Sequence, residues 1–489
     1  MKSIKCILFA LAVLMVCSCS KRDYQQVIPA NATVVAKVNL KSLSEKGDFA
    51  HSALLDMVGA MSGGSKEMNK YTKDPMETGI DFTEPVYVFV TQDNLYGAVA
   101  KVANKSDLED FFSVLRKQNV ASRPTEKNGL TCGSVGFADY AFDGDALLLV
   151  GGVSGRSVST EVLVRMMENE GESFIDTEAF KKMEDAGGKD IVMYANLGNL
   201  LGVLPKDIKT YMQNDQLKAS DIDLLANVDF VDGSAIMATK WWGKTEKAQK
   251  MIDDWKEVLQ AADGCYIEDV PENMVAWFGA GVKGNKALEK LKGNALAKES
   301  LFMMERAIDI EQMIRSIDGD VSIAVPKTML SGRGDVDLAV KAKLKETAFL
   351  ADVDDWKKSM ADYGISMQST GKDAYSLWAD GLNIHWGVEG GNLYFATPKA
   401  YQQMNTKNSS SALKEYEKEI KDSRMFFFID LQKILKANKP YVALASKAGV
   451  NLQSLKAVVL KSPAHDEMIL RIDMDDSNKN FLKQLLIQK

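Results

Sequence analysis

The stretch LYGAVAKVANKSDLEDFFSVL, residues 95–115, predicts a strand that leads directly into a helix. Its first residues have the β-rich alternation of a strand, and the acidic run DLEDF at 107–111 is typical of a helix start. The same succession returns in VDLAVKAKLKETAFLADVDDWKKSM, residues 336–360, where DVDDW takes the place of DLEDF. Recurrence of a whole strand–helix succession indicates that the chain contains one structural unit twice.

Two further pairs of segments support this duplication. IPANATVVAKV from Ile28 matches VPENMVAWFGAGV from Val270, and IVMYANLGNLL from Ile191 matches MFFFIDLQKIL from Met425. All three pairs occur in the same order and at a near-constant separation, which short chance matches do not produce. The sequence therefore predicts a first α+β repeat unit over residues 28–262 and a second over residues 263–489.

Local signals predict the kind of fold inside each unit. Asp143-Gly144, between two apolar runs, is a strong hairpin signal, and residues 389–392 are its counterpart in the second unit. Ser106 and Glu109 fit a capping box, and residues 245–262 carry a one-sided apolar stripe that predicts a helix. We therefore expect an α+β fold: two similar units in tandem, each with a largely antiparallel sheet packed by helices.

The sequence of the N-terminus predicts a targeting signal. Two lysines precede an apolar run that is too short to span a bilayer as a helix, which is the pattern of a signal peptide. Ser18 directly before Cys19, with Val16 two positions further back, resembles the lipobox of bacterial lipoproteins. We predict a signal peptide over residues 1–18, an acylated Cys19 and a short tether over residues 19–27. The alternative is an ordinary signal peptide cut nearby.

Composition excludes some classes of function. The formal net charge is −7 and becomes more negative once the two signal lysines are removed, so nucleic acid is not an expected partner. The chain is long enough for two or more domains. No later apolar stretch reaches the length of a transmembrane helix. We therefore expect the protein to bind a membrane only through its N-terminal lipid anchor.

Residues with catalytic or metal-binding chemistry are scattered. Cys132 and Cys265 remain after processing and could form a disulfide in an exported protein, or stay as two separate buried thiols. The histidines, at positions 51, 385 and 465, show no metal spacing. We therefore assign no catalytic residue, no metal ligand and no cofactor from the sequence.

Two other patterns have both a structural and a functional interpretation. Asn39, Asn196 and Asp430 each end a strand and start a helix, which favours helix capping over ligand binding. Trp241 and Trp242 could form a sugar-stacking platform, but adjacent strand residues face opposite sides of a sheet. We expect one of these tryptophans in the core and the other at an edge.

Several segments together carry a family resemblance: CSKRDYQQVIPANATVVAKVNLKSLSEK from Cys19, KDPMETGIDFTEPVYVF from Lys73, then YGAVAKV and FDGDALLLVGG. They resemble a lipoprotein family of Bacteroides-type bacteria, the domain-of-unknown-function family 4836, over the whole mature chain. This resemblance implies a Gram-negative envelope lipoprotein. It implies no activity and no catalytic residues.

Two functions follow as hypotheses. The first is a non-catalytic envelope lipoprotein that binds an envelope protein or a small ligand. The second is a hydrolase with a site built from scattered carboxylates such as Asp139, Asp143 and Glu389. The run Ser20–Asp23 lacks the acidic character of surface-exported lipoproteins, so we expect an outer-membrane anchor facing the periplasm, with the cell surface as the alternative.

Overall fold

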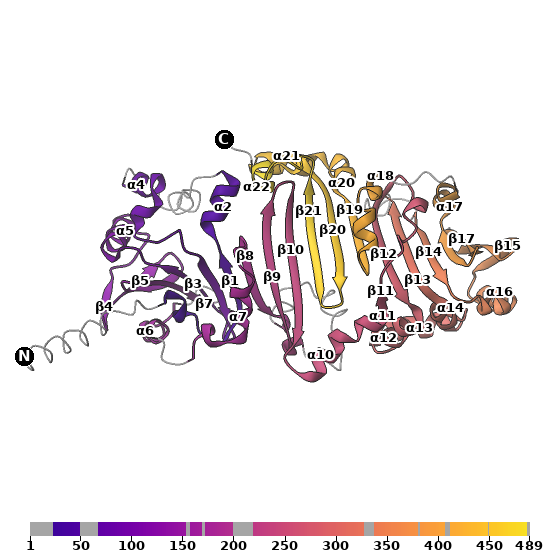
Figure 1. Ribbon diagram of the computed structural model, residues 1–489, viewed down its shortest axis with the longest axis horizontal. Helices are drawn as coiled ribbons and strands as arrows, with labels where there is room; N and C mark the ends of the chain where they lie inside the picture. Colours follow the sequence, from indigo (N-terminus) through magenta and orange to yellow (C-terminus); the bar gives the residue numbers. More distant parts are fainter. Residues whose placement is uncertain are drawn as a thin grey trace, which may run out of the picture. The chain divides into compact units, whose positions relative to one another are not determined.

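The computed structural model describes residues 23–48, 67–152, 157–168, 172–198, 219–326, 337–379, 382–405, 411–447 and 449–486. The chain divides into two compact units, Met1–Ala195 and Asn196–Lys489. Each unit combines antiparallel strands with helices, which confirms the predicted α+β class (Figure 1). Within the described ranges, no helix is both long and apolar enough to cross a membrane.

The strands of the first unit pair antiparallel in one ladder. In order of pairing they are β8 (Ile191–Asn196), β1 (Ala32–Val38), β2 (Val86–Thr91), β3 (Leu95–Lys101), β7 (Ala146–Gly152), β6 (Ala138–Phe142), β5 (Leu130–Val135) and β4 (Thr125–Lys127). Its helices include α2 (Leu40–Gly47), α4 (Met68–Lys73), α5 (Lys105–Lys117), α6 (Thr160–Glu168) and α7 (Glu178–Asp185), with 3-10 turns at η1 (Tyr24–Val27), η2 (Pro75–Thr78) and η4 (Phe174–Asp176).

The second unit has a longer antiparallel ladder. In order of pairing its strands are β9 (Ile222–Val231), β10 (Ser234–Gly243), β21 (Glu467–Met474), β20 (Leu455–Ala464), β19 (Met425–Asp430), β12 (Met274–Lys283), β13 (Ile317–Pro326), β14 (Ala339–Leu344), β18 (Asn392–Ala396), β17 (Leu382–Glu389), β16 (Ala374–Ala379) and β15 (Ser366–Gly371). The short β11 (Leu259–Gln260) also pairs with β12.

The helices of the second unit lie between these strands in sequence. They include α10 (Glu246–Asp253), α11 (Trp255–Val258), α12 (Gly284–Lys292), α13 (Ala295–Glu305), α14 (Ile310–Ser316), α16 (Val353–Asp362), α17 (Pro398–Asn405), α18 (Ser411–Lys414), α19 (Glu417–Lys421), α20 (Leu431–Ala437), α21 (Lys439–Lys447) and α22 (Phe481–Leu485).

The two ladders repeat one topology. The order β8-β1-β2-β3-β7-β6-β5-β4 of the first unit recurs as β19-β12-β13-β14-β18-β17-β16-β15 in the second. The register recurs too: Ala36 in β1 pairs with Met193 and Val88, and Phe278 in β12 pairs with Phe427 and Ile323 at the corresponding places. The prediction of two similar units in tandem is therefore confirmed.

Both predicted hairpins are present. β6 and β7 join at Asp143-Gly144, where the Asp143 carboxylate accepts hydrogen bonds from the backbone N–H groups of Asp145 (2.8 Å) and Ala146 (2.9 Å). β17 and β18 join through Gly390 and Gly391, whose φ angles of 56° and 79° lie in the left-handed region that such tight hairpin turns require.

A pair of hairpins lies at the start of the second ladder, where β9, β10, β21 and β20 are side by side (Figure 1). β10 and β21 pair in a register that is symmetric about Met237 and Leu470. Ser234, the first residue of β10, lies opposite Asp473, and Glu467, the first residue of β21, lies opposite Lys240. This register gives the two hairpins a local two-fold relation.

The compact units differ from the predicted repeat units. The predicted boundary after residue 262 falls inside the second compact unit, because β9 and β10 precede it in sequence but β10 pairs with β21. Repeat units and compact units are thus two different divisions of this chain. The boundaries 28–262 and 263–489 of the repeat units stay a prediction.

Helices cover one end of each ladder. In the first unit, Leu108, Phe111, Phe112 and Leu115 of α5 form a buried cluster with residues of β6 and β7. In the second, Val353, Trp356 and Met360 of α16 form a cluster with residues of the strands from β14 to β18. On the other face of the second sheet, α17, α18 and α19 contribute to a core around Trp277, Phe426 and Phe428.

Two local predictions were wrong in detail. The stripe at residues 245–262 is not one helix: α10 ends at Asp253, α11 is a short turn of helix, and residues 259–260 enter β11. The N-cap of α5 is Asn104, whose side chain accepts from the N–H groups of Ser106 and Asp107, so Ser106 lies inside the helix. An asparagine in the loop after β3 takes the place expected of the serine.

Candidate functional site

Two rows of apolar side chains cross the second sheet on one face. Directly opposed residues of an antiparallel pair point to the same side, so the register defines each row. The central row is Val228, Met237, Leu470, Leu460, Phe427, Phe278 and Ile323. The adjacent row is Phe230, Ala235, Ile472, Val458, Ile429, Ala276 and Val325. We call these two rows the open face.

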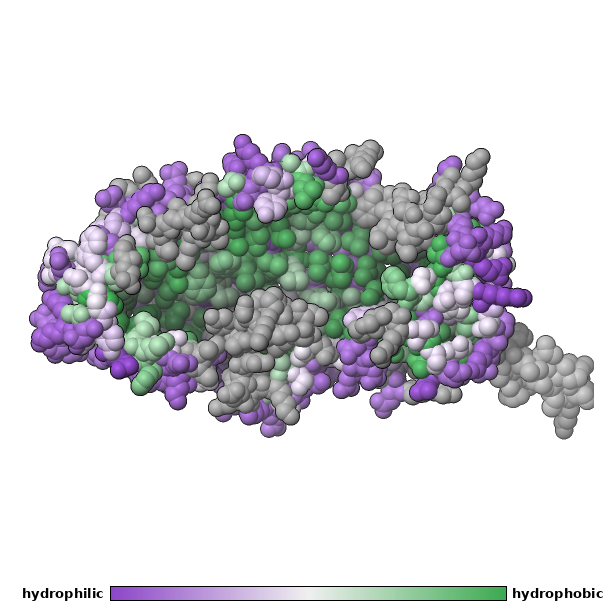
Figure 2. Space-filling view, turned by 180° about the vertical axis from the view of Figure 1, so that it is seen from behind, coloured by the Kyte–Doolittle hydropathy of each residue, from purple (hydrophilic) through white to green (hydrophobic). Residues whose placement is uncertain are grey.

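Every member of the open face is only half-buried. Next to them in the same strands, Phe426, Phe428 and Trp277 are almost fully buried in the helix-covered core. Figure 2 shows the apolar surface as a hollowed green area over the central strands. The sheet therefore packs one face against helices and leaves the other apolar and in contact with solvent.

The open face carries no charge. The residues that alternate with it on β9, β10 and β21 include Asp229, Lys240, Glu467 and Arg471, and all of these lie on the opposite face. Antiparallel sheets that face water on one side normally place polar residues there. A wide apolar face instead of a polar one marks an interaction site.

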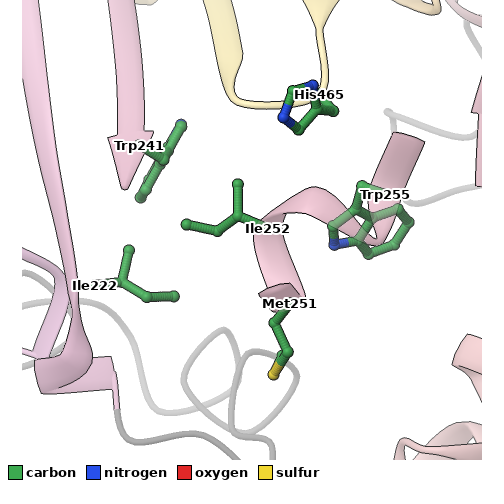
Figure 3. Close-up of a pocket in the computed structure, with 6 residues that line it drawn as sticks. All are labelled: Ile222, Trp241, Met251, Ile252, Trp255 and His465. Atoms are coloured by element: carbon green, nitrogen blue, oxygen red, sulfur yellow. The ribbon is translucent and has the colours of Figure 1, made fainter. Parts of the chain in front are cut away.

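A pocket of about 210 Å³ lies beside β9 and β10, beyond the buried residues Leu224 and Ala226 that separate it from the central row (Figure 3). Its lining consists of Ile222, Trp241, Met251, Ile252, Trp255 and His465. Ile222 and Trp241 continue the open-face side of β9 and β10, since Trp241 lies opposite Leu224 and Gly243 lies opposite Ile222. The pocket is smaller than a site for a whole drug-sized molecule, so it suits one end of a longer apolar ligand.

Helix α10 closes this pocket because its start is fixed close to the end of β10. The Thr245 side chain accepts from the N–H of Ala248, and the N–H of Gly243 donates to the Gln249 side chain at 3.0 Å. A Cβ on Gly243 would lie 2.1 Å from the backbone nitrogen of Gln249, so only glycine allows this close approach. Met251 and Ile252 are thereby held against the sheet.

His465 is the titratable residue in the pocket lining. Its Nε2 lies 3.2 Å from an Asp253 carboxylate oxygen, and its Nδ1 lies 3.5 Å from Asp466. A hydrogen bond from Lys256 holds the pKa of the Asp253 carboxyl below its usual value, so this carboxylate is ionised near neutral pH. Because two carboxylates lie beside the histidine, the rim of the pocket would repel an anionic group. The apolar lining of the pocket interior suits hydrocarbon.

The cysteines do not form the disulfide that the sequence allowed. Cys132 lies in β5 of the first unit and Cys265 lies in the core of the second, and both thiols are free and buried. Burial raises the pKa of both thiols above the ordinary value, which keeps them protonated. The alternative, two separate buried thiols, describes this structure.

The three carboxylates of the hydrolase hypothesis are not brought together in one unit. Asp139 accepts a hydrogen bond from Ser157 at 3.0 Å, and Asp143 fixes the β6–β7 turn, both in the first unit. Glu389 is exposed at the end of β17 in the second unit. Each of the first two carboxylates therefore has a structural role.

The other predicted candidates fall in three groups. His385 packs against Tyr401 with the rings tilted by 34° and their centroids 5.2 Å apart. Asn39 and Asp430 cap helices as predicted. Trp241 and Trp242 point to the two different faces of the sheet, and Trp242 pairs with Asp223 of β9. Residues 1–18, Cys19 and His51 lie outside the described residues. Among the described residues, no cluster of His, Cys, Asp or Glu could hold a metal ion.

Sequence reasoning missed the open face, although the signal was present. Segments such as MFFFI at 425–429 and AVVL at 457–460 are apolar at every position, so both sides of the strand are apolar. Such runs are typical of strands buried on both faces. Only the structure shows that one of these faces stays in contact with solvent.

Comparison with known proteins gives a family but no activity. The family model described as "Domain of unknown function (DUF4836)" matches residues 24–459. No curated protein was found to be similar. Among solved structures, two crystal forms of TP0453 are similar at 12% and 10% identity, with TM-scores of 0.31 and 0.30; they cover 49% and 45% of this chain and 85% and 80% of theirs. We base no functional conclusion on so distant a likeness.

Proposed function

The chain belongs to the DUF4836 family, and from the geometry of its second unit we propose that it is a non-catalytic envelope lipoprotein that binds the hydrocarbon chains of amphiphiles. The observation that supports this proposal is the half-buried, uncharged open face, together with the pocket beside β9 and β10. Hydrocarbon is the occupant that such a surface matches, because it needs no hydrogen-bonding partner.

A protein partner fits this surface less well. Typical protein interfaces carry about one hydrogen bond per 100–200 Å². The two rows of the open face offer no charged side chain, and the backbone groups of these strands pair within the sheet. The hollow visible in Figure 2 also favours a flexible chain over a flat protein surface.

The dimensions suit acyl chains. The rows cross seven strands, or about 29 Å at the usual spacing between strands of about 4.8 Å. One leaflet of a bilayer is about 15 Å of hydrocarbon, so a single acyl chain fits along a row with room to spare. A dozen methylenes covered on one side, at about half of the ~0.8 kcal/mol for full burial, contribute roughly 5 kcal/mol. That corresponds to sub-millimolar binding.

The membrane part of the proposal rests on the sequence. An acylated Cys19 would anchor the protein in the outer membrane with the folded part in the periplasm, or on the cell surface if export continues. A binding surface for acyl chains is consistent with a protein that functions next to a lipid bilayer, where molecules with acyl chains occur.

The test is a titration of the full mature chain with a dansyl-labelled fatty acid. Met237, the second residue of the central row, is replaced by lysine, and Ile236→Lys is the matched control on the opposite face beside Asp229. We expect Met237→Lys to weaken binding about tenfold or more, since it removes apolar contact worth 1.5 kcal/mol or more and adds a charge. The Ile236→Lys control should bind like the unmodified chain.

Equal affinity of the Met237→Lys variant and the unmodified chain would show that chains do not bind on the open face. Absence of binding to the unmodified chain would refute the function itself. Circular dichroism of both variants shows whether the fold is kept.

A further inference from the structure

The first unit carries its own pair of apolar rows. One row consists of Met193, Ala36, Val88, Ala98 and Leu149, and the adjacent one consists of Ala195, Val34, Val90, Tyr96 and Gly151. Each row runs across β8, β1, β2, β3 and β7 at one register position per strand. We call these rows the first-unit face.

Exposure separates the β2 and β3 part of this face from the core behind it, while Ala195 at the β8 end is buried. Val88 and Tyr96 are 44% and 50% exposed, although both lie inside paired strands. Tyr87 and Phe89, on either side of Val88, are fully buried. An exposed valine in the middle of a sheet, between two buried aromatic residues, shows that β2 has one closed and one open side.

The rows correspond to those of the open face at three strands, where β8, β1 and β2 take the places of β19, β12 and β13. Phe278 pairs with Phe427 and Ile323 as Ala36 pairs with Met193 and Val88. At the far end of each row the corresponding helix, α5 or α16, packs against the ladder. The two faces therefore share the part of the sheet formed by these three strands, which is present once in each ladder.

We infer that the first-unit face is a second binding site, which holds one hydrocarbon chain of its own, so that the protein binds two. This inference rests on the function proposed for the open face. The five strands of each row span about 19 Å, close to the ~15 Å of an acyl chain within one leaflet. Neither row contains a charged side chain.

The experiment counts bound chains. Native mass spectrometry of the full mature chain with palmitic acid, followed by titration with the dansyl-labelled fatty acid, gives the number of sites. Val88→Lys removes the apolar character of the first-unit face at an exposed position. Met76→Lys is the matched control, because Met76 is also 44% exposed but lies in η2 rather than in a strand.

We expect two palmitates on the unmodified chain and on Met76→Lys, one on Val88→Lys, one on Met237→Lys and none on the double variant Val88→Lys/Met237→Lys. Tyr96→Lys should reproduce the loss seen with Val88→Lys. Urea unfolding of each variant shows whether the fold is kept.

Each other outcome refutes a different claim. A single palmitate that is lost in Met237→Lys and kept in Val88→Lys would overturn the second site while leaving the open face in place. Binding that survives Met237→Lys but disappears in Val88→Lys would refute the open face as the site. A concentration-dependent dimer that Val88→Lys abolishes, with no change in palmitate binding, would assign the first-unit face to a second copy of the chain.

Discussion

Phe426 and Phe427 are neighbours in β19 that point to opposite faces of the second sheet, and their replacement by alanine should have very different costs. Phe426 is 1% exposed and lies 6.1 Å, centroid to centroid, from both Trp277 and Tyr416. Phe427 belongs to the open face and is half-buried. The same chemical change therefore tests directly whether the open face is part of a core.

The expected magnitudes follow from burial. Truncation of a fully buried phenylalanine to alanine costs about 3–5 kcal/mol, because transfer and cavity terms add. Phe427 already contacts water and leaves no closed cavity, so we expect roughly 1–2 kcal/mol for Phe427→Ala. Palmitate binding should weaken in Phe427→Ala, because the central row loses its aromatic ring.

Tryptophan fluorescence during urea unfolding measures these costs in the relevant unit. All seven tryptophans of the chain lie between residues 241 and 386, within the second compact unit. The unfolding midpoint should fall strongly in Phe426→Ala and slightly in Phe427→Ala. A loss of stability in Phe427→Ala as large as that in Phe426→Ala would mean that the open face is a closed core, and the proposed binding site would be lost with it.

Two further predictions concern the half-buried ion pair of Glu419 and Arg471 and the lipid anchor. Burial alone would raise the pKa of Glu419, but hydrogen bonds from Arg471 and Lys461 outweigh burial and lower this pKa. The ionised carboxylate therefore stabilises the fold at pH values above its pKa in the unfolded chain, and this stabilisation decreases as the pH falls. Glu419→Gln should therefore lower the urea midpoint at pH 7. The difference should begin to shrink near the ordinary glutamate pKa of about 4.3 and disappear once the pH has fallen through the lowered pKa of the folded state; a constant difference at all pH values would contradict this. Cys19→Ala should abolish labelling with radioactive palmitate and move the protein from the membrane fraction to the soluble fraction, and retention in membranes would refute the predicted lipid anchor.

Local features of this fold could be predicted from the sequence. The hairpins at residues 143–144 and 389–392 depend on turn residues that tolerate or require unusual backbone angles, and the caps at Asn39 and Asp430 depend on one side chain each. The repeated strand–helix succession also gave the correct fold class. In all of these the cause lies within a few residues of the effect.

Features that depend on distant partners could not be predicted. Nothing near Met237 indicates that it pairs with Leu470, and this pairing places β9 and β10 in the second compact unit. The apolar runs of β19 and β20 predict burial on both faces, because the sequence does not show whether a helix covers each face. The open face could not be predicted for that reason, and the pattern around Trp241 indicated only a core or edge position or a sugar-stacking residue.

The pairing of β10 with β21 has a consequence for how the chain acquires its structure. β10 is complete at Gly243, but the edge that it presents to β21 stays unpaired until Glu467–Met474 have been added. Contacts between such distant segments close late and slow folding. An unpaired apolar edge meanwhile invites pairing with other chains. Nascent molecules of this protein should therefore depend on chaperones for most of their synthesis, and a C-terminal truncation should cause aggregation rather than a simple loss of one strand.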